Sequence, residues 1–144
     1  MKPVFQKIIS ADIGDCFSAC IASILEVSFD VPNFHSDDHS SWLMKWNNWL
    51  EPINLQLVWF PFGFEPMPNG YAILSVSSAL FPEMTHAVVW YQGKDGKGKI
   101  IHNPNPSDPR RNNISFDDYR LIYVLGVLDP SKSVGVSAMQ DTET

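Results

Sequence analysis

A cysteine at the start of an apolar segment is the first feature of this chain that can carry covalent chemistry. Apolar side chains follow Cys16 at the spacing of one buried helical face, at Phe17, Cys20, Ile21, Ile24 and Leu25. Asp15 is a good helix N-cap, which puts Cys16 at the first helical position. A thiol there lies beside unpaired backbone N–H groups and the positive end of the helix dipole, and both favour the thiolate.

A structural role for Cys16 has to be weighed beside this one. Most cysteines are small buried hydrophobic residues, and a neighbouring carboxylate such as Asp15 raises the pKa of a thiol. Cys20 lies one turn further along the apolar face and is expected in the core. This segment alone therefore leaves Cys16 open as either a nucleophile or a core residue.

A thiol nucleophile needs a base, and a histidine begins a predicted strand later in the chain. His86 opens this strand, and a glycine-rich hairpin joins it to residues 99–102, which Asn103 follows. Neighbouring strands lie roughly 4.8 Å apart, so we expect Asn103 to meet and hold the ring of His86. His102 is a rival base, but it would point to the opposite face from Asn103.

The histidines and Asn103 also have ordinary structural interpretations. A lone histidine at a strand end is more often hydrogen-bonded or on the surface than catalytic, and Asn-Pro is a frequent turn. His35 and His39 flank two carboxylates at a spacing that resembles metal ligands. Because no third soft ligand lies near them in the sequence, a solvated loop is favoured, and no metal or organic cofactor is expected.

The elements that must position these residues follow the order helices first, strands second. A second helix is predicted over 41–50, with one apolar face that should pack on the first helix, made of Trp42, Leu43, Trp46, Trp49 and Leu50. Strands are predicted at 55–60, 71–76, 86–92, 99–102 and 120–128, the last apolar enough to be central. This order predicts an α+β fold in which N-terminal helices pack on a C-terminal antiparallel sheet.

Composition predicts one acidic domain. The chain has 144 residues, 44% of them hydrophobic, which is enough for one core and too little for two ordinary domains. We expect the domain to span 1–128 and a flexible tail to span 129–144. The net charge of −6, without a stripe of Lys or Arg, disfavours binding to duplex nucleic acid.

The cysteines and the apolar segments bear on the compartment. Two cysteines four residues apart on one helix are poorly placed to form a disulfide. No apolar segment approaches the ~20 residues that span a bilayer, and the first fifteen residues lack a signal-peptide core. We therefore expect a cytoplasmic protein with no membrane partner.

Four motifs together resemble a known family. GDCFSACIASIL at 14–25, VPNF at 31–34, HAVVW at 86–90 and IHNPNP at 101–106 look like the small papain-like cysteine peptidases of bacteria and their phages. That group is similar to the leader-peptide-processing peptidase domains of bacteriocin exporters. The resemblance runs from about residue 6 to residue 106. It implies a papain-like fold, a Cys16-His86-Asn103 triad, and a place in a bacterial cell or phage-infected host.

Two positions depart from the pattern of that family. The small bacterial group tends to carry aspartate where this chain has Asn103, and an amide orients His86 without stabilising its cation as strongly. The glutamine that supplies an oxyanion donor lies closer to the nucleophile in the exporter domains, whereas Gln6 precedes Cys16 by ten residues. Gln6 and the backbone N–H of Cys16 are the candidate oxyanion donors.

The sequence therefore predicts a papain-like cysteine hydrolase, a peptidase or amidase. Its substrate would be a peptide, a protein or a small molecule with an amide, thioester or isopeptide bond. The main alternative is a binding protein without chemistry, for instance a phage-type factor that sequesters a small ligand or inhibits a host protein. An acyl or peptidyl transferase is a third interpretation, which shares every site residue and differs only in the acceptor.

Overall fold

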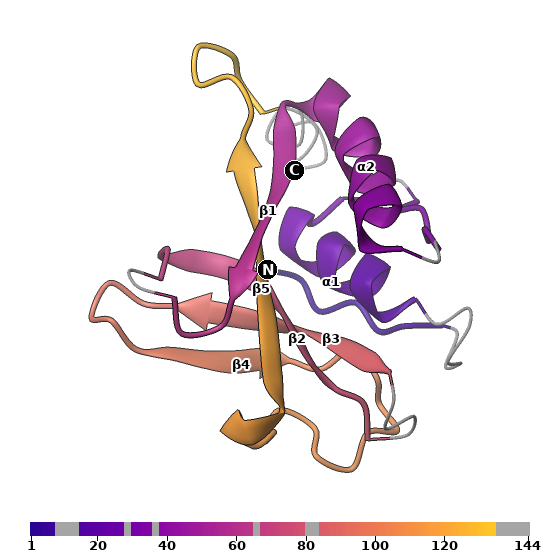
Figure 1. Ribbon diagram of the computed structural model, residues 1–144, viewed down its shortest axis with the longest axis vertical. Helices are drawn as coiled ribbons and strands as arrows, with labels where there is room; N and C mark the ends of the chain where they lie inside the picture. The colour runs from indigo at the N-terminus through magenta and orange to yellow at the C-terminus, as the bar shows by residue number, and fades with distance from the viewer. Residues whose placement is uncertain (8–14, 28–29, 36–37, 65–66, 80–83, 135–144) are drawn as a thin grey trace.

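Two helices precede a five-stranded antiparallel sheet in the computed structural model, which describes residues 1–7, 15–27, 30–35, 38–64, 67–79 and 84–134 (Figure 1). The helices are α1 (Cys16–Leu25) and α2 (His39–Leu50), and two short 3-10 helices are η1 (Glu51–Ile53) and η2 (Phe116–Asp118). The strands are β1 (Leu55–Pro61), β2 (Gly70–Ser77), β3 (Thr85–Gln92), β4 (Gly98–His102) and β5 (Tyr119–Val127). The predicted α+β class and element order are confirmed.

The last strand of the chain lies inside the sheet. The strand order is β1-β5-β2-β3-β4, so β5 pairs with β1 on one side and with β2 on the other. Tyr123 is the register partner of Trp59 in β1 and of Ile73 in β2. A strand with two neighbours and two covered faces needs a nearly continuous apolar run, which is why its sequence predicted a central position.

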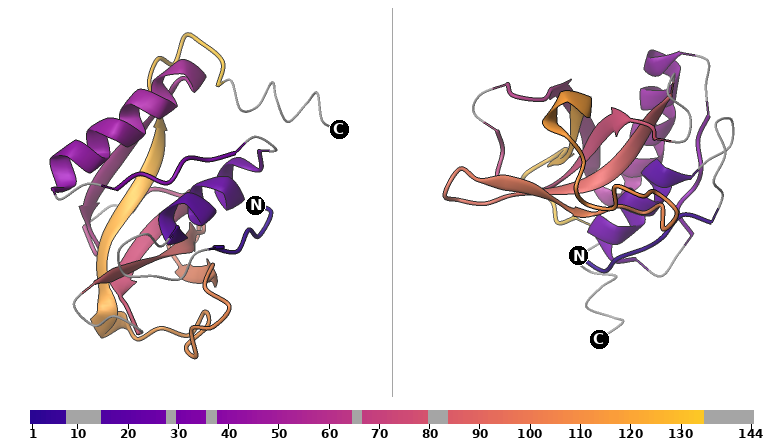
Figure 2. Two further views of the ribbon diagram at one scale, coloured as in Figure 1. Left: turned by 90° about the vertical axis from the view of Figure 1, so that its right-hand side faces the viewer. Right: turned by 90° about the horizontal axis from the view of Figure 1, so that it is seen from below.

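Both helices pack on the same face of the sheet (Figure 1, Figure 2). Helix α1 lies against β3 and β2, and α2 lies against β1. The two helices meet through aromatic rings, because the ring centroid of Phe17 lies 4.6 Å from that of Trp42 and 5.3 Å from that of Trp46. Trp46 is fully buried. The predicted packing of the tryptophan face against the first helix is confirmed.

The opposite face of the sheet carries a second apolar cluster. Side chains alternate between faces along a strand, so Ile73 and Val89 join the helix-side core whereas Leu74 and Val88 join the other cluster. Ile114, from the segment between β4 and β5, packs into this second cluster. That packing anchors the long segment that begins at Asn103.

The N-terminal arm is extended and follows α1 (Figure 2). Residues 1–7 form no helix or strand. Lys2 donates its backbone N–H to the carbonyl of Ser23 at 3.1 Å, and Val4 donates to the Ser23 hydroxyl at 2.8 Å. Gln6 donates its backbone N–H to the carbonyl of Pro104 at 2.9 Å. The arm therefore runs from α1 to the end of β4.

Two predicted boundaries differ in the structure. Helix α2 begins at His39 rather than residue 41, because the Asp38 carboxylate caps it by accepting the backbone N–H of Ser41 at 2.8 Å. The chain also stays attached after residue 128, where a flexible tail was expected. Asn54 donates its side-chain amide to the carbonyls of Asp129 and Lys132, each at 2.9 Å. Residues 135–144 of that expected tail, and Gly14 before the cysteine, lie outside the described residues.

Within the part of the chain that the structure describes, no helix combines the length and the apolar character that crossing a bilayer requires.

Candidate active site

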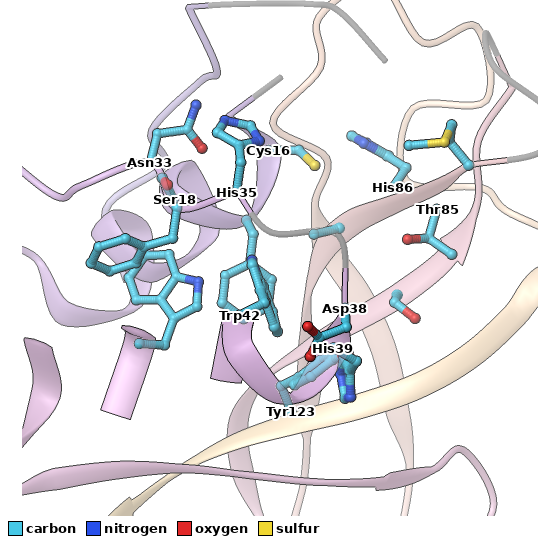
Figure 3. Close-up of a pocket in the computed structure, with 16 residues that line it drawn as sticks. Cys16, Ser18, Asn33, His35, Asp38, His39, Trp42, Thr85, His86 and Tyr123 are labelled. Atoms are coloured by element: carbon cyan, nitrogen blue, oxygen red, sulfur yellow. The ribbon is translucent and has the colours of Figure 1, made fainter. Parts of the chain in front are cut away.

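Cys16 and His86 line one cavity of about 320 Å³ between α1, α2 and the beginning of β3. Cys16 is the first residue of α1 and is half-buried, and His86 is the second residue of β3. Figure 3 shows the sulfur of Cys16 and the imidazole of His86 pointing toward each other across this cavity. The predicted juxtaposition of a thiol from the first helix and an imidazole from the sheet is therefore confirmed.

The beginning of α1 is held differently from the sequence prediction. Asp15 occupies the N-cap position, but its side chain does not cap the helix. Its two carboxylate oxygens instead accept the backbone N–H of Lys7, at 3.1 and 3.2 Å. The backbone N–H of Phe17, which belongs to the group that a capping carboxylate would bind, acts to lower the pKa of the Cys16 thiol. The Asp15 carboxylate thus binds the N-terminal arm and does not cap α1.

Burial opposes the thiolate form of Cys16. Burial raises its pKa above the usual value, the N–H groups of Ala87 and Phe17 act in the opposite direction, and the charge of Asp15 raises it further. Burial dominates, so the net pKa is raised. Desolvation of the sulfur thus opposes the thiolate that the start of the helix alone favours.

His86 is a neutral imidazole with a defined tautomer. Its Nε2 lies 2.7 Å from Oδ1 of Asn103, and because an amide oxygen only accepts hydrogen bonds, Nε2 carries the proton. The lone pair is then on Nδ1, the ring nitrogen that can accept a proton from a thiol. Burial lowers the pKa of His86 below its usual value, although the hydrogen bond that its Nε2–H donates to Asn103 acts against that shift. The predicted contact between Asn103 and His86 is confirmed.

Asn103 is itself fixed by four hydrogen bonds. Its Oδ1 also accepts the backbone N–H of Asn105 at 3.1 Å. Its Nδ2 donates to the Asp108 carboxylate at 3.0 Å and to the carbonyl of Arg111 at 2.7 Å. Asp108 is only 2% exposed and forms an ion pair with Arg110 at 2.8 Å.

Asp108 and Arg110 were not predicted as site residues from the sequence. They lie in an irregular segment after β4 in which no helical or strand period marks a buried side. The available signal was local: an Asp-Pro pair at 108–109 followed by two arginines, a few residues after Asn103. An acidic residue next to arginines in a proline-rich turn is a candidate for a buried ion pair.

His102 serves the N-terminal arm and not the cavity. Its Nε2 lies 2.7 Å from the carbonyl oxygen of Val4, and the ring of Phe5 meets it edge-on at 4.9 Å between centroids. His102 is not among the residues that line the cavity. This agrees with the preference for Asn103 as the residue that meets His86.

Gln6 lies beside the site without lining the cavity. Its backbone N–H is bound to Pro104, the residue after Asn103, and the next residue, Lys7, is bound to Asp15. The arm therefore passes between the two segments that carry the candidate nucleophile and the residue that holds the base. Gln6 is not among the cavity-lining residues, so its proposed role as an oxyanion donor stays a prediction.

The histidines of the expected metal-like motif also face the cavity. His35 and His39 line it, and His39 Nε2 lies 2.9 Å from the hydroxyl oxygen of Tyr123. Among the described residues, no group of three or more His, Cys, Asp or Glu side chains is arranged to hold a metal ion. Asp37, the other carboxylate of the motif, lies outside those residues.

The wall of the cavity opposite His86 is largely aromatic. Five rings contribute to it, from Phe17, Phe34, Trp42, Trp46 and Tyr123. Asp38 is the single carboxylate among the wall residues that the structure describes, and hydrogen bonds from Ser41 lower its pKa, so it is ionised near neutral pH. Among the described residues that line the cavity there is no lysine or arginine. The cavity is thus suited to a neutral or basic group and unfavourable for an anion.

The chain was compared with models of protein families, with curated proteins and with solved structures, and none of the three comparisons gave a match.

Proposed function

We propose that this protein is a papain-like cysteine hydrolase that cleaves an amide, thioester or isopeptide bond. One observation carries the proposal: Cys16 and His86 face one cavity, and the Nε2 of that histidine is bound to Asn103 at 2.7 Å. This is the order and geometry of a nucleophile, a base and a residue that orients the base. The order Cys, His, Asn is also that of papain-like peptidases, which the motifs resemble.

The reaction begins with proton transfer from a neutral pair. When a carbonyl group enters the cavity, Nδ1 of His86 accepts the thiol proton of Cys16 and the sulfur attacks the carbonyl carbon. The carbonyl oxygen becomes an oxyanion, which the backbone N–H of Cys16 and the side chain of Gln6 stabilise. The imidazolium then donates its proton to the leaving amine, and the bond to that amine breaks.

The acyl group is then released by water. His86 accepts a proton from a water molecule, which attacks the carbonyl carbon of the acyl-thioester formed on Cys16. The carbon–sulfur bond breaks, and the proton returns from the imidazolium to the sulfur. The products are a carboxylic acid and the free thiol, and no metal or organic cofactor takes part.

The cavity wall limits the acyl group that can bind. Aromatic rings from α1, α2 and β5 favour an apolar side chain next to the scissile bond. The ionised Asp38 disfavours an acidic group at the same place. We therefore propose neutral, apolar peptides or small acyl amides as substrates.

A binding protein without chemistry is the second candidate, and one observation favours it. Burial raises the pKa of Cys16 and lowers that of His86, and both shifts favour the neutral pair over thiolate and imidazolium. A cavity of this kind can hold an apolar ligand without turning it over. The test must therefore separate covalent chemistry from occupancy.

A peptide vinyl sulfone with an apolar side chain next to the electrophile provides that test. We expect it to alkylate Cys16 in the wild type and in Cys20→Ala, and to leave Cys16→Ala unmodified, as read by intact mass and peptide mapping. A fluorogenic peptide amide with the same side chain should be hydrolysed by the first two proteins only. Equal binding of the peptide by all three proteins, without adduct or hydrolysis, would favour the binding protein.

A further inference from the structure

The segment that follows β4 builds a buried polar network behind Asn103. Asp108 lies at its centre, with 2% of the residue exposed. Its Oδ2 accepts from Nδ2 of Asn103 at 3.0 Å, and the same oxygen lies 2.8 Å from Nη2 of Arg110. Its Oδ1 accepts from Nε of Arg110 at 3.1 Å. Arg110 therefore binds both oxygens of the carboxylate, and one of them, Oδ2, also accepts from Asn103.

The network is tied to the sheet as well as to the segment. Arg110 also donates Nη1 to the carbonyl of Ser77, at the end of β2, at 2.8 Å. The same nitrogen lies 3.8 Å from the carboxylate of Asp118 in η2. Because β2 pairs with β3, which carries His86, the position of Asp108 is set relative to the imidazole through the sheet.

The partners of the Asn103 amide permit only one orientation. As the group stands, its oxygen faces two donors, His86 Nε2–H and the N–H of Asn105, and its nitrogen faces two acceptors, Asp108 and the carbonyl of Arg111. Turning the amide over would place oxygen against oxygen on one side and N–H against N–H on the other. Four hydrogen bonds would be lost in a buried place, where unmade bonds are costly.

We propose that Asp108 is a positioning residue of this site, which holds the Asn103 amide so that its oxygen faces Nε2 of His86. This proposal rests on the proposed function, in which His86 needs its lone pair on Nδ1 to accept the thiol proton. Asp108 touches neither the thiol nor the cavity, and it acts through Asn103. In a Cys-His-Asp triad the carboxylate binds the imidazole directly. In this chain the buried carboxylate of Asp108 reaches the imidazole through Asn103.

The charge of Asp108 also acts on the imidazole at a distance. Cys16 faces His86 from α1, and His35, Asp38 and His39 lie on the other wall of the cavity. Behind Asn103, the negative charge of Asp108 raises the pKa of His86 and the positive charge of Arg110 lowers it. The two charges therefore have opposite effects on the pKa of His86.

The test uses long-range ¹H–¹⁵N NMR of the imidazole rings, which reads both tautomer and titration. The chain has four histidines, so His86 is assigned with a His86→Gln variant. Asp108→Asn removes the charge and keeps an acceptor, Asp108→Ala removes both, and Arg110→Gln removes the opposite charge. Circular dichroism and the thermal midpoint verify that each variant is folded.

We expect Nε2–H as the dominant tautomer in the wild type and a mixture of tautomers in Asp108→Ala. The pKa of His86 should fall in both Asp108 variants and rise in Arg110→Gln. Hydrolysis of the fluorogenic peptide should fall by about 10- to 100-fold in Asp108→Ala, as is typical of residues that orient a reacting group. If the folded variants keep the wild-type tautomer and titration, Asp108 is not a positioning residue.

The failure of this proposal can be distinguished from that of the proposed function. A wild-type His86 with its proton on Nδ1 would overturn the positioning role, whether or not Cys16 reacts with the vinyl sulfone. The expected NMR results together with an unreactive Cys16 would retain the positioning role and overturn the hydrolase. If Asp108→Ala does not fold, the tautomer of His86 in Asp108→Asn decides, because the positioning role requires the share of Nδ1–H to rise when the charged acceptor is lost.

Discussion

The two cysteines of α1 show how one helical turn separates a candidate reactive group from a core residue. Cys20 is fully buried among apolar side chains, and burial together with Cys16 raises its pKa well above the usual value. Cys16 opens the same helix, lines a cavity, and receives the backbone N–H groups of Ala87 and Phe17. The difference lies in what faces each sulfur, because helix and residue type are the same.

The same contrast applies to two histidines on neighbouring strands. Both His86 and His102 are buried, and both use Nε2 in a hydrogen bond of 2.7 Å. The bond of His102 fastens the arm through Val4, whereas that of His86 leaves Nδ1 to the cavity. Burial therefore does not distinguish the two histidines. They differ in whether the ring lines the cavity and in which group lies against Nε2.

The largest effect should separate the two cysteines. Cys16→Ala is expected to lower hydrolysis of the fluorogenic peptide by roughly 10⁴-fold or more, because the nucleophile is lost. Its free energy of unfolding should change little, since the side chain lines a cavity. Cys20→Ala should retain hydrolysis and lose about 1 kcal/mol of stability, because it leaves a small void in the core. Urea titrations and initial rates provide both numbers, and similar losses of activity in the two variants would erase the contrast.

The second effect separates the two histidines. His86→Gln should reduce the rate by about 100- to 10,000-fold, the usual contribution of a general base. His102→Gln should leave the rate within a small factor of the wild type and cost about 1 kcal/mol of stability, because the Val4 carbonyl loses its donor. Steady-state kinetics at constant pH measure the first result, and urea titration measures the second. A slow His102→Gln with a normal His86→Gln would reverse our assignment of the base.

The positions of Cys16, His86 and Asn103 were predictable because regular elements carry these residues or end next to them. The 3.6-residue period placed Cys16 at the start of α1, and the glycine-rich hairpin between β3 and β4 brought the start of β3, which carries His86, near Asn103, which follows β4. The helix-on-sheet layout and the central β5 followed from the same periods. Such patterns are readable because the spacing of apolar residues in a single sequence indicates which face of an element is buried.

The protonation states and the network behind Asn103 were not predictable in that way. The pKa of Cys16 depends on how deeply the sulfur is buried, and burial is a property of the assembled cavity. Asp108 meets Asn103 through a turn in an irregular segment, where no period marks the inward side. The course of the arm past Pro104 is likewise set by single hydrogen bonds.

A smaller kinetic effect should come from the arm. If Gln6 supplies an oxyanion donor, Gln6→Ala should lower kcat by about 100- to 1,000-fold while KM changes little. Gln6→Glu is the matched control, because it keeps the size and removes the amide donor. Unchanged kcat in both variants would assign the arm a purely structural role.

Acid should weaken the fold through Asp108. Burial alone would raise the pKa of this carboxyl, but the hydrogen bonds from Arg110 and Asn103 outweigh burial and lower the pKa from 3.8 to about 2. A lowered pKa stabilises the folded state above the usual value, and that contribution of about 2 kcal/mol is lost as the pH falls from about 4 toward 2. Asp108→Asn should be less stable than the wild type at pH 6 and should lose less on acidification. The free energy of unfolding of both proteins is measured by urea titration at each pH. The same pH dependence in the two proteins would contradict this account.

The smallest effect concerns the cavity wall. A peptide with glutamate next to the scissile bond should have roughly tenfold lower kcat/KM than one with glutamine, because the charge of Asp38 opposes it. Asp38→Asn should reduce this difference, and added salt should reduce it in the wild type. Equal values for both peptides would show that this residue of the substrate does not occupy the cavity.

The central claim is that Cys16 and His86 react as one unit, and alkylation rates test it without a substrate. Iodoacetamide at pH 7, with each cysteine quantified by peptide mapping, should modify Cys16 far faster than Cys20. The His86→Gln substitution should slow the modification of Cys16 by roughly tenfold or more. Equal, slow modification of both cysteines, or a rate at Cys16 that does not depend on His86, would contradict the account.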